Sequence, residues 1–146
     1  MIPLRLALLP LLVAAFLALT TRAAPAQEDP VETRLAAFFQ ALQDGTETPE
    51  KTFSTLLTGS PLAEKEEDVK KLVEQYTAFD RTYGPFVANE KLSVKPVGSS
   101  VIVTRYLFKA QKFPLAWHFV FYRPNPTGMW VLISLKLDTR IDQLGG

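Results

Sequence analysis

The chain has 146 residues, a formal charge of +1 and no cysteine. This length suits one domain rather than two, and the lack of cysteine excludes a disulfide framework and a lipid-anchored N-terminus. Thirteen acids and 6 bases lie between Glu28 and Glu90, against 2 acids and 8 bases from Lys91 onward. Such asymmetry can mark an acidic or nucleic-acid partner, but mutual attraction of the two halves within one fold is the simpler interpretation. Nucleic-acid binding would need clustered bases and a basic total, so it is not expected.

Residues 1–26 are typical of a signal peptide. Arg5 supplies a positive start, an apolar run extends from Leu6 to Leu19, and Ala24 and Ala26 are the small residues that a signal peptidase reads. As a helix this run would reach about 21 Å, short of a hydrocarbon core of about 30 Å, which disfavours an uncleaved anchor. We expect cleavage after Ala26 and export to the bacterial periplasm or beyond. No stable membrane anchor is then expected, and residues 27–146 form a single domain.

The first half of the domain predicts helices. A helical stripe of apolar residues runs through 30–43 and ends at Asp44-Gly45. Thr48 is a predicted N-cap, with Pro49 at the first position of a short helix. A longer helix follows Gly59-Ser60-Pro61 and ends at Gly84-Pro85. Its predicted buried face holds six residues: Leu62, Val69, Leu72, Tyr76, Phe79 and Tyr83.

After Pro85 the period of the apolar pattern falls to two, which predicts strands at about 86–95, 100–109, 114–123 and 129–138. The turns between them are too short for parallel crossovers, so the sheet is expected to be an antiparallel meander. Helices followed by strands in one small domain indicate an α+β fold. We expect the helices to pack on one face of a curved, cone-like sheet of four strands.

This order of helices and aromatic strands, ending in WVLISLKLD, resembles the nuclear transport factor 2-like superfamily, a cone-shaped α+β fold. The resemblance spans most of residues 30–142 and rests on element order rather than on a diagnostic motif. It departs from the family at residues 44–61, which leave little room for the usual small hairpin between early helices. A cystatin-like arrangement of a helix and four strands is the rival interpretation. The superfamily includes isomerases, dehydratases, ligand-binding domains and dimerisation modules, so the fold alone does not choose a function.

The strand pattern assigns the only histidine to the outer face of the sheet. Leu115, Trp117, Phe119 and Phe121 should face the helices, which turns His118 outward between Arg105 and Ser134 on the neighbouring strands. In the last strand, the inward set is expected to be Val131, Ile133, Leu135 and Leu137.

The outward set is too apolar for a surface left in water, so it predicts an interface. We therefore expect a non-catalytic module that self-associates or binds a partner, in the first place as a homodimer. The predicted interface residues are Val101, Val103, Arg105, His118, Val120, Tyr122, Trp130, Leu132 and Ser134.

Two other functions stay open. One is a carrier of a small apolar ligand between helices and sheet, in a pocket lined by Phe39, Tyr76, Phe79, Tyr106, Trp117 and Phe119.

The other is an isomerase, because enzymes of the resembled superfamily use a carboxylate base and a donor such as tyrosine in this space. Asp80 is the only nearby carboxylate, and the helical pattern places it beside the core rather than in it. We assign no catalytic residue and expect neither a metal site nor a cofactor, since one histidine without cysteine cannot build a zinc site.

Overall fold

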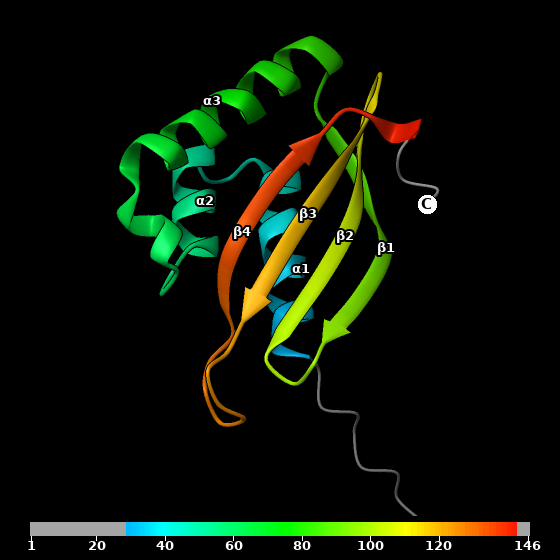
Figure 1. The fold of residues 1–146 in the computed structure, drawn as a ribbon. Helices are drawn as coiled ribbons and strands as arrows, with labels where there is room; N and C mark the ends of the chain where they lie inside the picture. The colour runs from blue at the N-terminus through cyan, green and yellow to red at the C-terminus, as the bar shows by residue number, and fades with distance from the viewer. Residues whose placement is uncertain (1–28, 143–146) are drawn as a thin grey trace, which may run out of the picture.

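The computed structural model describes residues 29–142, which form three α-helices packed on a four-stranded antiparallel sheet (Figure 1). The predicted α+β class is confirmed, whereas the predicted signal peptide lies outside the described residues. The elements are α1 (Pro30–Asp44), α2 (Pro49–Leu56), the 3-10 helix η1 (Pro61–Glu64), α3 (Glu66–Tyr83), β1 (Phe86–Val97), β2 (Val101–Ala110), β3 (Pro114–Tyr122) and β4 (Val131–Asp138).

The helix ends follow from local capping. The Asp29 carboxylate accepts a hydrogen bond from the Val31 amide at 2.9 Å, and Gly45 ends α1 with a φ of 60°, in the left-handed region. The Thr48 hydroxyl accepts from the Lys51 amide and caps α2, as predicted. One boundary differs: Leu62 belongs to η1 rather than to the long helix, because the Ser60 hydroxyl caps a separate turn.

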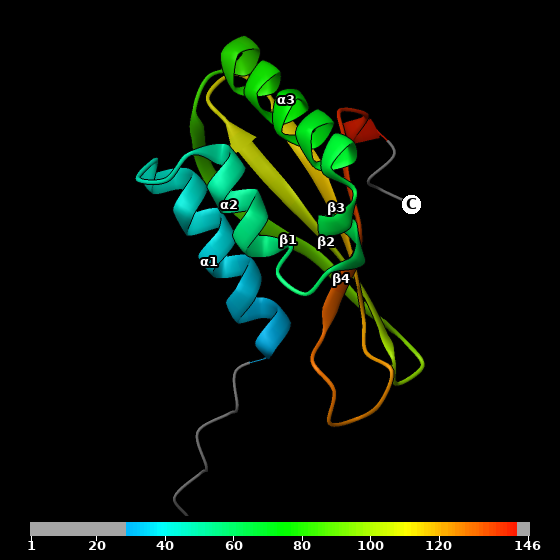
Figure 2. The same ribbon diagram turned by 90° about the vertical axis from the view of Figure 1, so that its left-hand side faces the viewer.

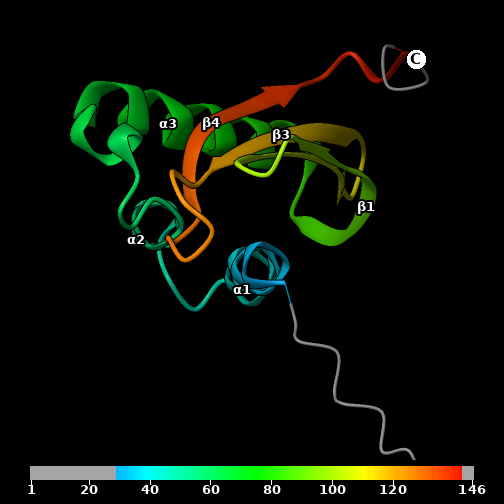
Figure 3. The same ribbon diagram turned by 60° about the horizontal axis from the view of Figure 1, so that its bottom comes forward.

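The sheet has the strand order β1-β2-β3-β4, with every neighbouring pair antiparallel, so the predicted meander is confirmed. The helices lie on one face of the sheet, and within the described residues no helix covers the opposite face (Figures 1, 2 and 3). Residues 45–60 hold α2 and its flanking turns rather than a hairpin.

The core lies between the helices and the inner face of the sheet. Trp117 and Phe119 of β3 are 0% exposed, and the Trp117 ring lies 5.5 Å from that of Phe38 and 5.7 Å from that of Phe108, between centroids. Burial of large aromatic side chains dominates the stability of a small domain. The predicted inward set of β3 is therefore correct.

The register of β4 differs from the prediction. An irregularity between Val120 and Phe121 leaves Ile133 without a partner on β3: Val120 pairs with Ser134, whereas Phe121 pairs with Leu132. Because one extra residue exchanges the two faces of a strand, Leu132 is 0% exposed and Ile133 is 37% exposed. The expectation that Leu132 faces outward and Ile133 inward is wrong. Val131 was also expected inward, but it pairs with Tyr122 on the outer face.

β1 is a long edge strand with two irregularities. The pairing with β2 shifts between Phe86 and Ala88 and again between Lys91 and Ser93. Its exposed large apolar side chains are Val87, Leu92, Val94 and Val97.

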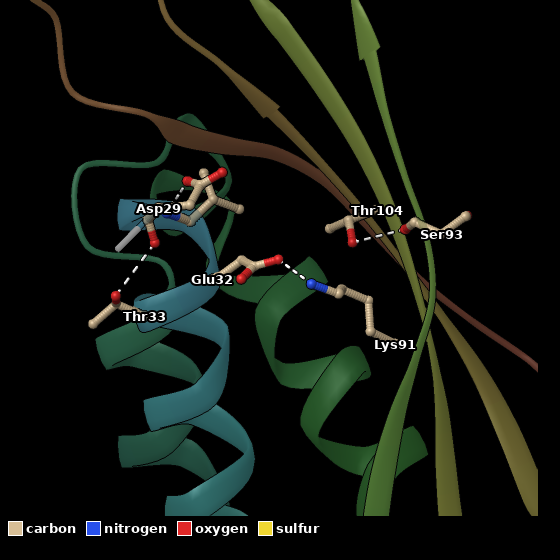
Figure 4. Close-up of polar contacts among 7 residues, drawn as sticks. Asp29, Glu32, Thr33, Lys91, Ser93 and Thr104 are labelled. Atoms are coloured by element: carbon tan, nitrogen blue, oxygen red, sulfur yellow. Dashed lines mark hydrogen bonds and ion pairs between the residues drawn. The ribbon is translucent and has the colours of Figure 1, made fainter. Parts of the chain in front are cut away.

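A polar tie joins α1 to β1 on the helical side of the sheet. Between the two shifts, Lys91 pairs with the inward-facing Tyr106, and its ammonium forms an ion pair with Glu32 of α1 (Figure 4). The Thr104 hydroxyl donates to the Ser93 carbonyl at 3.0 Å across the same irregular stretch of β1 (Figure 4).

Arg34 fixes the loop that precedes β4 against two helices. Its guanidinium donates to the carbonyls of Trp130 (3.0 Å), Leu56 (2.6 Å) and Thr58 (2.6 Å), and burial lowers its pKa. The Trp130 side chain packs against the core, with the Arg123 guanidinium 4.4 Å from its ring centroid. Trp130 was expected on the outer face, and this packing against the core corrects that assignment.

Candidate functional site on the outer face of the sheet

The outer face of the sheet is organised in rows of directly paired residues. Residues opposite each other on neighbouring strands share a face, so the pairings define which side chains stand together. The apolar row holds Val97, Val101, Tyr122 and Val131; the next holds Lys95, Val103, Val120 and Ser134; the cationic row holds Ser93, Arg105, His118 and Lys136; and the fourth holds Glu90, Leu107, Ala116 and Asp138.

The cationic row places three nitrogen-bearing side chains side by side on β2, β3 and β4. Arg105 pairs with His118, as predicted, but the next partner of His118 is Lys136 and not Ser134. The cause is the shift in β4, which moves Ser134 to a position opposite Val120. Arg105 Nε donates to Ser93 Oγ at 3.1 Å, and within residues 29–142 no carboxylate lies at ion-pair distance from Arg105 or Lys136.

The pKa of His118 is lowered by burial and by the other cations of its row. Burial is the largest cause, followed by the charge of Arg105, with Lys136 acting in the same direction and Asp138 opposing them. The histidine is therefore neutral at pH 7, and protonation would add a third positive charge to the row.

The next outward residue of β4 after Lys136 is Asp138, whose carboxylate already forms an ion pair with Arg140. Asp138 receives hydrogen bonds from Arg140 Nε at 3.2 Å, Arg140 Nη2 at 3.1 Å and the Arg140 amide at 2.9 Å. These bonds lower the pKa of Asp138 and keep it ionised. An open groove of about 650 Å³ follows β4 here, and its lining includes His118, Ser134 and Lys136.

The apolar row and its neighbour form the remaining part of the predicted interface. Val101, Val103 and Val120 are half-buried, while Tyr122 is 38% exposed and Val97 53% exposed. Without Leu132 and Trp130 the apolar area is smaller than the sequence indicated. Sequence reasoning placed Lys136 on the outward side of the last strand, but it missed Lys95 and Val97 of β1 as members of this surface.

The predicted interior pocket is occupied by the protein's own rings. Five of the six predicted lining residues, all except Phe79, have rings in contact with one another. For example, the ring centroids of Phe39 and Tyr106 are 5.1 Å apart, and those of Tyr76 and Trp117 are 6.4 Å apart. Phe79, the sixth, packs on Tyr83 and Phe108. Trp117 Nε1 is buried without a hydrogen-bond partner and would suit an acceptor atom of a ligand, which would have to displace these rings.

The arrangement around Asp80 lacks the contact that a general base needs. Asp80 is half-buried, in agreement with its predicted place beside the core rather than in it, and its carboxylate makes no hydrogen bond to any of residues 29–142. Burial, followed by the charge of Asp80, raises the pKa of Tyr76 to about 12. That value makes Tyr76 a neutral core residue at ordinary pH rather than an activated acid.

Comparison of the chain with family models, with curated proteins and with solved structures gave no match. In the part of the chain that the structure describes, no helix is long and apolar enough to cross a membrane. Nor does this part contain three or more His, Asp or Glu side chains grouped so that they could hold a metal ion.

Proposed function

We propose that the protein is an exported, non-catalytic binding module whose outer sheet face binds an acidic protein surface. The observation that carries this proposal is the cationic row, in which Arg105, His118 and Lys136 are direct neighbours without a carboxylate partner for Arg105 or Lys136. Arg105 and Lys136 are like charges on either side of the neutral His118, and protonation of His118 would place like charges directly opposite each other, which destabilises a sheet. A partner that supplies carboxylates would relieve this repulsion, and the adjacent valines would add apolar burial.

The resemblance to the nuclear transport factor 2-like superfamily belongs to the same proposal. Helices followed by a four-stranded antiparallel meander agree with it, and an uncovered sheet face suits binding modules of such a fold. α2 lies where the family usually has a hairpin, which favours the simpler cystatin-like arrangement at that point. Export rests on the pattern of residues 1–26.

A symmetric homodimer through the same face is the second candidate, and the apolar row favours it. Val97 and Tyr122 are exposed, and the half-buried Val101 lies between them in the row. Burial of such a patch is the usual origin of self-association. Superposing the two cationic rows would, however, bring Arg105 of one copy against cations of the other. The symmetric contact is therefore confined to the apolar end.

The test of the acidic-partner proposal uses poly-L-glutamate as the probe. Calorimetric titration should show binding that weakens as salt rises, because exposed charges are screened over about 8 Å at physiological ionic strength. The double variant Arg105→Gln/Lys136→Gln should bind about tenfold more weakly, since two exposed ion pairs each contribute up to about 1 kcal/mol.

The matched control is Lys51→Gln/Arg81→Gln, which removes the same charge from exposed positions on the helices. This control should bind poly-L-glutamate as the wild type does, and thermal unfolding should show both variants folded. Equal affinity of the two double variants would overturn the proposal, because net charge rather than the cationic row would then govern binding.

A further inference from the structure

The charges of the protein are segregated between its two layers. Residues 29–85, which form the helical layer, contain 11 acids and 6 bases, whereas residues 86–142, which form the sheet, contain 3 acids and 8 bases. Within residues 29–142, Lys91–Glu32 is the only ion pair that joins the layers. Among the described residues, the expected mutual attraction of the two halves is thus represented by one ion pair, although the helices lie directly on one side of the sheet (Figure 3).

An apolar groove lies between α2 and α3, within the acidic layer. Its volume is about 370 Å³, and its apolar lining comprises Leu57, Ala63, Val69 and Val73. Its charged lining residues are Glu50, Glu66, Lys70 and Glu74. The groove is therefore an apolar strip with a net negative border, which is the complement of the apolar row and the cations beside it.

We propose that the acidic surface bound by the outer sheet face is the α2–α3 groove of a second copy of this chain. This inference rests on the proposed function and names its partner. The exposed Val97 and Tyr122 would enter the apolar groove, while Lys95 and Arg105, one and two rows along the sheet, would lie near the glutamates of its border. Buried apolar area would supply affinity, and the charges would fix orientation.

Such a contact joins two different surfaces, so it is heterologous. Each copy keeps a free sheet face at one end and a free groove at the other, and association continues into open chains unless a rotation closes a ring. No cationic row meets another cationic row, which removes the repulsion that limits the symmetric dimer.

The experiment uses two charge-reversal variants of the purified exported protein, followed by sedimentation velocity at low salt. The sheet variant is Arg105→Glu/Lys136→Glu, and the groove variant is Glu66→Lys/Glu74→Lys. In each variant, the sheet face and the groove border carry charges of the same sign. The average mass of the wild type should rise with concentration and fall with salt. Each variant alone should associate at least tenfold more weakly.

Mixing the variants gives the decisive result. The intact groove of the sheet variant can still bind the intact sheet face of the groove variant, and the two reversed surfaces are again opposite in charge, so mixing should restore the association that each variant alone has lost. The control Glu64→Lys/Glu67→Lys reverses two exposed glutamates outside the groove lining and should associate as the wild type does. If reversal at Glu66 disturbs folding, Glu66→Gln/Glu74→Gln serves in its place with a smaller expected loss.

Three outcomes overturn the inference, and they differ in what they say about the proposed function. A wild type that stays monomeric at low salt, yet binds poly-L-glutamate through Arg105 and Lys136, leaves the proposed function standing with a different partner. A groove variant that associates as strongly as the wild type shows a symmetric sheet contact instead. Failure of poly-L-glutamate binding removes the proposed function and this inference together.

Discussion

The inner and outer faces of β3 differ in composition and exposure although one strand builds both. Inward, Trp117 and Phe119 are fully buried among aromatic rings; outward, His118 and Val120 are half-buried and Tyr122 is exposed. Because successive side chains of a strand point to opposite faces, stability can depend on one set and partner binding on the other. The two properties should therefore respond to different substitutions, even at adjacent positions.

The largest expected effect tests that separation directly. Phe119→Ala should lower the free energy of unfolding by about 3–5 kcal/mol, the usual cost of truncating a buried aromatic residue. Val120→Ala, its outward neighbour, should cost less than about 1.5 kcal/mol because its environment is only partly apolar. Urea denaturation monitored by tryptophan fluorescence measures both values. Similar losses for the two variants would show that the outer face is part of the core.

A smaller loss of stability is expected when the hydrogen bonds of Arg34 at the border of the core are removed. Arg34→Met should lower the free energy of unfolding by about 1–3 kcal/mol, since it leaves the carbonyls of Trp130, Leu56 and Thr58 without their donor. Urea denaturation again provides the measurement, with Arg81→Met on the exposed surface of α3 as the control. If both substitutions cost the same, the three hydrogen bonds contribute nothing specific.

The smallest effect concerns the pH response of His118 on the outer face. Burial and Arg105 hold its pKa below the ordinary value of 6.5 in the free protein, with Lys136 adding to this and Asp138 opposing it. An acidic partner would raise that pKa, so binding would take up a proton. Affinity for poly-L-glutamate should therefore rise as pH falls from about 7 to 5.5, and His118→Gln should lose this dependence.

The direction of this response separates the two candidate functions. A symmetric dimer would weaken as protonation of His118 adds positive charge to both copies, whereas binding of an acidic surface would tighten. The same lowered pKa also makes the unfolded chain bind the proton more readily, so the free energy of unfolding should fall slightly as pH drops below about 6.5. NMR titration of the histidine ring, with and without poly-L-glutamate, measures the shift.

Much of the fold followed from local sequence signals. Gly45 and Thr48 mark helix ends by their own conformational and hydrogen-bonding preferences, and β3 alternates so strictly that its inward set was predicted correctly. The pairing of Arg105 with His118 followed from the short turn between β2 and β3. These features depend on residues close together in the chain.

The errors share a physical cause. β4 carries apolar residues on both parities, so its pattern does not say where an extra residue enters the pairing, and the irregularity at Ile133 moved Leu132 to the core and Lys136 beside His118. Leu132 was the available hint, because it is an aliphatic residue two positions before the polar Ser134 on the predicted outward side of this strand. The α2–α3 groove could not be predicted, since it depends on how two helices lie against each other.

The two irregularities in β1 also bear on aggregation. A twelve-residue edge strand with Val87, Leu92, Val94 and Val97 exposed offers unpaired backbone groups and apolar side chains, the requirements for templating a cross-β fibril. The breaks in register, together with lysines and a proline that cannot donate a hydrogen bond, prevent any long regular stretch from meeting an identical copy. A deletion at Leu92 that removed the second break in register would lengthen the regular stretch of this edge and favour amyloid-like assembly.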